Sequence, residues 1–354
     1  IFVVCDPFLN GKGAFQPLYD ALAEENLNYI VCDDFTRDPT DIMVNKVAAI
    51  AVKAEIDGII GIGGGGTMDI AKCVNQLIHS EFPINRYLGP EWNMPNPGVP
   101  MIMIPTTCGT GSETSPAISL IDTAQGIKTG NVVPNNVPML AIIDPSYGLT
   151  MPPSLTAQSG LDTICHAVET IVSAQRNVVS TALALKSLEL AWNGLPRALA
   201  DGNNLEARSD MSAAGMLASM AFSDASIGVG HLIAHALGAK YHTPHGELCA
   251  IVLPPLIEFL AVRLPDEVRM IAPIIGVDPT AEHWEVMIGK AIRDYARSKG
   301  LRSAKKCGIP RKGILGMTQQ VYQGIQDSRA ADPTIKASSK EDVRQLMIKI
   351  ADDC

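Results

Sequence analysis

Residues 58–72 read GIIGIGGGGTMDIAK, an apolar run that passes through four glycines into a helical pattern. Within it, Gly61, Gly63 and Gly66 form a GxGxxG pattern. Glycine lets backbone N–H groups approach a ligand closely, and the N-terminus of the following helix favours negative charge. A tight strand-to-helix turn would leave the same pattern, but the position between a strand and a helix favours nucleotide binding. A phosphate loop of the GxxxxGK[ST] type is excluded because no Lys-Ser/Thr pair follows the glycines.

The segments around this loop alternate between two patterns. Strand-like runs at 1–6, 27–32, 58–64, 101–107, 117–122 and 139–144 are interrupted by helical patterns near 14–25, 40–55 and 67–79. This alternation predicts a parallel sheet with helices on its faces. After the Pro-rich break MPPSL at 151–155, strand-like runs nearly vanish. Helices are predicted there at 156–174, 178–199, 206–224, 229–240, 246–262, 281–299, 311–326 and 339–352.

The predicted architecture is therefore an α/β N-terminal domain at 1–150 and an all-α C-terminal domain at 151–354. The 354-residue chain is 47% hydrophobic and 18% charged, which is typical of a well-buried globular enzyme. Its net charge of −9, without a Lys/Arg run, argues against nucleic acid or an anionic membrane as partner. No uninterrupted apolar stretch is long enough to predict a membrane span. The eight cysteines are scattered, which favours a reducing cytoplasm over a disulfide scaffold.

Two further features belong to the nucleotide half. The loop PTTCGTGSETSP at 105–116 offers the hydroxyls of Thr106 and Thr107 beside flexible backbone, as a dinucleotide crevice would need, although a solvated surface loop would look the same. Asp6 ends the first strand, where an acid can accept hydrogen bonds from a ribose or simply stabilise a turn. Cys108 has no neighbouring base and is expected to be a structural thiol. The chain opens directly on a strand-like run without an initiator Met or a signal peptide, and we expect native residues to precede Ile1.

The helical half carries side chains of the types that bind metals. Asp162 and His166 are four residues apart, as are His231 and His235, so each pair shares one helix face. His245 follows in the loop TPHG and could fold back toward the preceding helix. Taken alone, the first pair could be a helix cap and a buried core histidine. Two histidines on one face of an otherwise apolar helix, however, need partners, and one carboxylate with three imidazoles suits Fe(II) or Zn(II).

Four motifs together resemble the iron-containing (group III) alcohol dehydrogenases. They are GGGGTMDIAK, PTTCGTGSE, GLDTICHAVE and GHLIAHALGAKYHTPHG, and they follow in the family's order from about residue 1 to 260. The resemblance implies NAD, with NADP less favoured, and Fe(II), with Zn(II) as the alternative. It also implies that the N-terminal domain is Rossmann-like and that the protein is a homo-oligomer, a dimer or higher. The implied metal ligands are Asp162, His166, His231 and His245, and His235 is the implied proton relay.

The resemblance further assigns residues to the cofactor. These are Asp6, which matches the family acid associated with NAD preference, and Gly63, Gly64, Gly65, Gly66, Thr67, Asp69, Thr106, Thr107, Lys128 and Leu155. Gly66 stands where the family often has Ser, and QGIQDSRAADPT at 323–334 lacks the Gly-Asn-Pro-Arg ending expected there.

The expected reaction is hydride transfer between NAD and a small primary alcohol or diol and its aldehyde. Two alternatives remain from the sequence. A lyase similar to dehydroquinate synthase would need Lys and Arg around an anionic sugar phosphate, and the metal segments contain few of them. A catalytically silent nucleotide-binding scaffold would have no need of the metal-ligand set.

Overall fold

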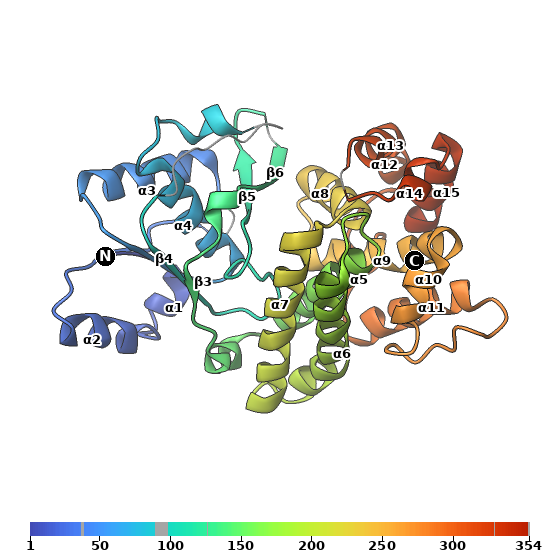
Figure 1. The fold of residues 1–354 in the computed structure, drawn as a ribbon, viewed down its shortest axis with the longest axis horizontal. Helices are drawn as coiled ribbons and strands as arrows, with labels where there is room; N and C mark the ends of the chain where they lie inside the picture. Colours follow the sequence, from blue (N-terminus) through green and yellow to red (C-terminus); the bar gives the residue numbers. More distant parts are fainter. Residues whose placement is uncertain (37–38, 89–97, 126, 329, 353–354) are drawn as a thin grey trace. The chain divides into compact units, whose positions relative to one another are not determined.

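The structure is a computed structural model that describes residues 1–36, 39–88, 98–125, 127–328 and 330–352, without the side chains of 127–131 and 134. The chain divides into two compact units (Figure 1). We call Ile1–Thr107 with Gly111–Tyr147 the sheet unit, and Cys108–Thr110 with Gly148–Cys354 the helical unit. The sequence placed a single boundary at 150. Residues 108–110 precede this boundary but belong to the helical unit, because Gly109 packs against Ser159 and accepts a hydrogen bond of 3.2 Å from the Thr163 hydroxyl.

The sheet unit contains five parallel strands in the order β2-β1-β3-β4-β7. Their bounds are β1 Phe2–Cys5, β2 Ile30–Cys32, β3 Ile59–Gly63, β4 Met101–Pro105 and β7 Leu140–Ala141. The helices between them are α1 Pro7–Asn10, α2 Gln16–Glu24, α3 Asp41–Lys53 and α4 Gly65–Leu77. Short 3-10 helices span Ile84–Tyr87, Pro134–Asn136 and Pro145–Thr150.

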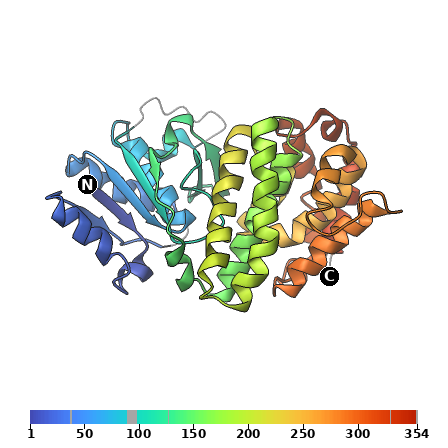
Figure 2. The same cartoon turned by 60° about the horizontal axis from the view of Figure 1, so that its bottom comes forward.

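Alternation along the strands separates two cores, one on each face of this sheet. In β1, Phe2 and Val4 pack with residues of α3 and α4, whereas Val3 and Cys5 pack with residues of α1 and α2. Successive side chains of a strand point to opposite faces, so helices cover both faces of the sheet (Figure 2). The predicted parallel sheet with helices on its faces is confirmed.

The strand order contains a topological switch point. The chain leaves β1 for α1 on one face and leaves β3 for α4 on the other, although β1 and β3 are neighbours in the sheet. Such a switch point opens a gap at the carboxyl ends of the two strands, which is where open α/β sheets bind their ligands. Asp6 and the four glycines lie directly after these two strands.

Two strands of the sheet unit form a separate antiparallel pair, β5 Ala117–Asp122 and β6 Ile127–Val132. The sequence predicted β5 but not β6, because the latter's IKTGNV has polar and glycine residues at its centre. The predicted run 139–144 pairs only over Leu140–Ala141.

The helical unit is formed by eleven helices within its described residues. They are α5 Pro153–Ile171, α6 Val178–Ala200, α7 Leu205–Ala225, α8 Val229–Tyr241, α9 His245–Arg263, α10 Pro265–Ile271, α11 Trp284–Ser298, α12 Arg311–Leu315, α13 Thr318–Asp327, α14 Pro333–Lys336 and α15 Lys340–Ala351. Figure 2 shows α6 and α7 as long neighbouring helices. The predicted all-α second half is confirmed.

Helix α9 is the centre of this unit's core. By length and composition it could cross a membrane, but 89% of that stretch is buried inside the protein, as in the core helix of a soluble domain. The bent pair α7 and α8 meets the same criterion only if it is counted as one broken span. Pro254 and Pro255 lie inside α9 rather than at its end. The predicted helix 311–326 is two helices, α12 and α13, separated by Gly316 and Met317.

Candidate active site

Helix α5 places the first two candidate ligands. Asp162 and His166 lie one turn apart on a helix whose residues are almost all buried from Thr156 onward, with exposures of 7% and 6%. An ionised carboxylate at such a depth needs compensating partners. The side chains available to it come from α8 and α9.

The end of α8 and the start of α9 supply three histidines. His231 is in the first turn of α8 and buried, His235 follows one turn later, and His245 is the first residue of α9. The ring centroid of His245 lies 5.2 Å from that of His231 and 5.1 Å from that of His235. The fold thus returns His245 to the preceding helix. His242 is an exposed residue in the left-handed conformation that ends α8.

These side chains converge on one carboxylate oxygen. Asp162 Oδ1 lies 3.3 Å from His245 Nε2, 3.4 Å from His231 Nε2 and 3.8 Å from His166 Nε2. Those separations exceed the usual N–H···O distance of about 2.7–3.2 Å. Ligand atoms about 2.0–2.2 Å from a tetrahedral metal lie roughly 3.4 Å apart, so the spacing suits donors around a cation. The buried His231 Nε2 makes no hydrogen bond to any described residue, which also fits a metal ligand.

Glu169 orients the His231 ring from the side opposite Asp162. No sequence pattern predicts this role for Glu169. Its Oε1 lies 2.6 Å from His231 Nδ1, and it accepts hydrogen bonds from the backbone N–H groups of His231, Gly228 and Gly230. A carboxylate on one imidazole nitrogen fixes the ring so that the other nitrogen presents its lone pair to a metal. A Cβ atom on Gly230 would lie 2.5 Å from Glu169 Oε1, so only glycine permits this approach.

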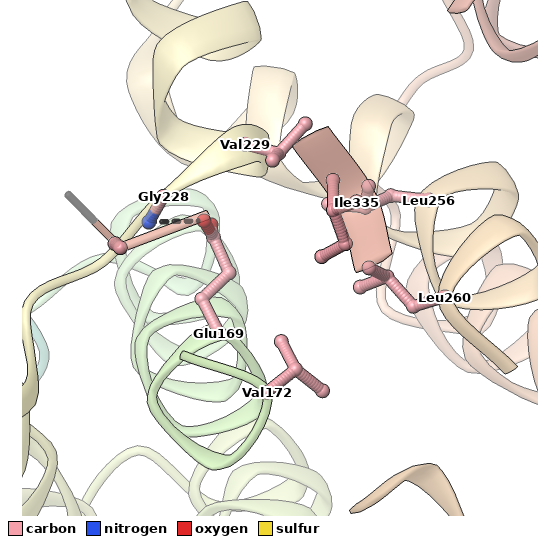
Figure 3. Close-up of a pocket in the computed structure, with 8 residues that line it drawn as sticks. Glu169, Val172, Gly228, Val229, Leu256, Leu260 and Ile335 are labelled. Carbon is pink, nitrogen blue, oxygen red and sulfur yellow. Dashed lines mark hydrogen bonds between the residues drawn. The ribbon is translucent and has the colours of Figure 1, made fainter. Parts of the chain in front are cut away.

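Figure 3 shows Glu169 bonded to Gly228 at the wall of a cavity of about 10 Å³. The other labelled side chains around this cavity are apolar: Val172, Val229, Leu256, Leu260 and Ile335. A volume of about 10–15 Å³ is the minimum for one water molecule, so the cavity is no binding site for substrate.

Electrostatics in this cluster follow from burial and close charges. Burial raises the pKa of Asp162, but the surrounding imidazoles outweigh it and hold that pKa well below its usual range. Burial lowers the pKa of His166 to about 4, which leaves a neutral ring able to bind a metal. Burial also lowers the pKa of His231, but the Glu169 carboxylate outweighs it and raises that pKa well above its usual range. A metal at His231 must therefore displace a proton.

The glycine loop of the sheet unit has the geometry of a phosphate site. Gly63 ends β3, Gly64 is the N-cap residue of α4, and the helix begins at Gly65. The Thr106 N–H donates to the Gly63 carbonyl at 2.9 Å, which brings the loop after β4 against the loop after β3. Thr107 Oγ1 is buried and has no hydrogen-bond partner among the described residues. The orphan hydroxyl beside the free N-terminus of a 13-residue helix fits a bound pyrophosphate.

A buried lysine of α4, which no sequence pattern marks, joins this helix to the segment 112–117 that follows β4. Lys72 Nζ donates to Ser112 Oγ at 2.8 Å and to the carbonyls of Ser115 and Ala117. Asp69 accepts from the Ser112 hydroxyl at 2.8 Å and from the Ser119 N–H at 3.0 Å. The helical pattern expected from residue 67 places Asp69 in the first turn of its helix. Because α4 begins at Gly65, Asp69 lies in the second turn and is buried among these groups.

Glu113 is the third ionisable group of this network. It is buried, and its Oε2 has no hydrogen-bond partner within the described residues. Burial raises the pKa of Glu113 to about 7 and lowers the pKa of Lys72 to about 8.

The remaining predicted cofactor residues lie in different settings. Asp6 is the N-cap of α1 and accepts from the Leu9 N–H at 3.0 Å, so one carboxylate oxygen has a structural partner. Thr67, in α4, is buried against Gly63, the last residue of β3. Leu155 packs against the helical core from the first turn of α5. The side chain of Lys128 is outside the described residues. Cys108 lies 3.2 Å from Ser212 Oγ in the helical unit.

Comparison with known proteins covers nearly the whole chain. The family model described as iron-containing alcohol dehydrogenase matches residues 1–145, and the model of that family's C-terminal domain matches residues 156–351. The chain belongs to the iron-containing alcohol dehydrogenase family. A 1-propanol dehydrogenase of Citrobacter freundii is 36% identical over 348 residues, which cover 96% of this chain and 89% of that protein.

Two other members of the family extend the comparison. An NAD-dependent methanol dehydrogenase of Bacillus methanolicus is 30% identical over 98% of this chain and 90% of its own length. The crystal structure of sulfoacetaldehyde reductase from Bifidobacterium kashiwanohense in complex with NAD⁺ superposes with a TM-score of 0.86 at 26% identity, over 99% of this chain and 90% of that one.

As a member of the iron-containing alcohol dehydrogenases, the chain is an oxidoreductase that interconverts alcohols and aldehydes, with NAD and a metal as cofactors. Family membership favours this activity over the lyase and the silent scaffold that the sequence left open.

Proposed function

We propose that this enzyme interconverts a small primary alcohol or diol with its aldehyde, using NAD in preference to NADP and one divalent metal. The observation that carries the proposal is the convergence of three imidazole Nε2 atoms on Asp162 Oδ1. The residues assigned to the metal are Asp162, His166, His231 and His245. Iron is the family's metal, and the same donors suit Zn(II).

Different residues around the metal site are assigned different roles in the reaction. When bound, the metal supplies Lewis-acid polarisation of the substrate oxygen, and NAD supplies the hydride acceptor or donor. Asp162 balances the charge of the cation. Glu169 holds the His231 ring in the orientation that exposes Nε2. His235 is only half-buried and its ring lies beside His245, so we assign it the transfer of the hydroxyl proton toward solvent.

In the sheet unit, the backbone N–H groups that begin α4 and the Thr107 hydroxyl are assigned to the NAD pyrophosphate. Asp6 is assigned to the adenosine ribose, where its charge would repel the 2′-phosphate of NADP. The related dehydrogenases of propanol and methanol support a short-chain substrate.

Metal analysis of the purified enzyme, combined with an aldehyde panel using NADH and NADPH, tests this proposal. We expect one metal per chain and faster oxidation of NADH than of NADPH with short aldehydes. A chain that binds NADH and metal but turns over none of the aldehydes would contradict the assigned reaction.

We also infer a cytoplasmic homo-oligomer, a dimer or higher. Free cysteines, most of them buried, support a reducing compartment. Light scattering on the eluting peak of a sizing column measures the mass in solution, and a monomer would contradict the assembly. Cell fractionation tests the compartment.

A further inference from the structure

A buried thiol lies beside the candidate metal ligands. Cys249 follows His245 by one turn of α9, so both side chains are on the same helix face. Its Sγ lies 3.5 Å from Asp162 Oδ1 and 3.7 Å from His245 Nε2, and the residue is 1% exposed. The sulfur is therefore no farther from Asp162 than the His166 nitrogen is, at 3.8 Å.

The sulfur belongs to a mutually close set of donors. The ligand atoms of Asp162, His231, His245 and Cys249 all lie within 4.8 Å of one another. His231 Nε2, buried and without a hydrogen bond to any described residue, points to a ligand in the same place independently of the thiol. Asp162 supplies one oxygen and His231 and His245 one nitrogen each, so the Cys249 sulfur is the fourth donor atom of this set.

A second thiol nearby provides a contrast. Cys165 is also buried and close to His231, but its Sγ donates to Glu169 Oε1 at 3.3 Å. It belongs to a second close set of possible donors, with Glu169 and His231, and it also lies beside Cys249. Only Cys249 belongs to the set that contains Asp162 and His245.

We propose that Cys249 is a sulfur donor to the metal of this centre. The inference rests on the metal centre of the proposed function and adds one ligand to it. As the metal–sulfur bond forms, the S–H bond breaks and its proton leaves to solvent, since a coordinating thiol is deprotonated. No electron is transferred. A thiolate among imidazole and carboxylate donors favours Zn(II) and Co(II) over Mg(II) and Mn(II).

Cobalt substitution tests the assignment. Metal-free protein is titrated with Co(II) under anaerobic conditions and followed by absorbance. The unchanged chain is expected to bind one Co(II) and to show both visible ligand-field bands and a near-ultraviolet sulfur-to-cobalt charge-transfer band. Cys249→Ser should keep the ligand-field bands and lose the charge-transfer band. The matched control Cys165→Ser removes an equally buried thiol and should keep both.

Each outcome bears on the proposal. A charge-transfer band that survives in Cys249→Ser, or one that is missing from the unchanged chain with Co(II) bound, overturns it and leaves Cys249 as a hydrogen-bond donor to Asp162. Failure of the unchanged chain to bind Co(II) at all overturns the proposed metal centre, and the sulfur ligand with it.

A second measurement needs no variant, in case Cys249→Ser does not fold. X-ray absorption on the unchanged, Zn(II)-loaded protein should show one sulfur neighbour at about 2.3 Å in addition to the nitrogen and oxygen shell at about 2.0–2.2 Å. A spectrum fitted by nitrogen and oxygen alone refutes the sulfur ligand.

Discussion

Replacement of Glu169 by Gln tests the link between the buried carboxylate and the metal ligand that it orients. Both oxygens of Glu169 are acceptors: Oε1 faces the N–H and Nδ1 of His231, and Oε2 faces the N–H groups of Gly228 and Gly230. Glutamine has nearly the same shape but only one oxygen. Its amide nitrogen must therefore point at two donors, whichever way the side chain is turned.

The expected effect has two parts. Two N–H groups lose their acceptor, and hydrogen bonds to a charged group contribute about 1.5–3 kcal/mol each, so the metal-free protein should lose about 3 kcal/mol or more of unfolding free energy. If the amide nitrogen faces Nδ1, the proton of His231 moves to Nε2 and blocks metal binding. Loss of such an orienting partner weakens metal affinity by about 10- to 100-fold.

Chelator competition with Zn(II) at neutral pH measures the affinity, and urea unfolding of the metal-free protein measures the stability. Glu258→Gln is the matched control, since Glu258 is also buried in the helical unit but is bonded to Lys349 and Arg293. It should leave Zn(II) affinity unchanged. If folded Glu169→Gln binds Zn(II) as tightly as the unchanged chain, the carboxylate does not orient His231 for the metal.

Four other predictions concern single side chains. His231→Ala should lose metal and activity together, whereas His235→Ala should keep the metal and lose about 10²- to 10⁴-fold in kcat, by metal analysis and steady-state rates; turnover by metal-free His231→Ala would refute the mechanism. Burial raises the pKa of Glu113 from 4.5 to about 7, so the folded state keeps the Glu113 proton up to about pH 7. Between pH 4.5 and about pH 7 the unfolded chain releases this proton more readily, and the free energy of unfolding should therefore fall by up to about 3 kcal/mol as pH rises. Glu113→Gln should flatten this slope in urea unfolding at successive pH values, and an unchanged slope would contradict the assignment. Lys72→Met should lower stability by about 3 kcal/mol and weaken NADH binding in a fluorescence titration without loss of metal, and unaltered NADH affinity would separate the lysine from the cofactor loops. Asp6→Gly should raise kcat/KM for NADPH relative to NADH by about tenfold or more, and an unchanged ratio would remove Asp6 from cofactor selection.

The sequence predicted the two-part architecture because its signals are local. Residues 58–72 show a strand, a glycine turn and a helix in one continuous run. In the second half, helices such as α11 and α15 are clearly amphipathic, whereas α9 is apolar on all sides and is recognised by its length. The histidines on α8 could be recognised as ligand candidates because two polar rings on one face of an apolar helix require an explanation. Short elements were missed for the same reason. With only seven residues, α10 has too few turns to show a period.

Partners distant in sequence could not be predicted from local pattern. Glu169 is three residues after His166 and shares its helix face, but its role depends on the Gly228 and His231 backbone about 60 residues later. Lys72 looks like an ordinary helix lysine until its three acceptors, 40 to 45 residues away, are brought to it. Cys249 sits in an apolar run, where a thiol usually behaves as a small hydrophobe. Only the fold shows that its sulfur meets a carboxylate.

Gly246, next to His245, sets how far apart the ligand-bearing helices stand. A methyl group at this position would overlap the Gln158 carbonyl oxygen of α5, so α9 starts with its main chain directly against that of α5. The distance between α5 and α9 is thus set by contact between their main chains. Repacking of side chains cannot change this distance. Because the two helices cannot move closer together or farther apart, an ion of different radius must be accommodated by rotation of the histidine rings. A larger residue at 246 would push α9 away from α5 and move His245 away from the other candidate ligands.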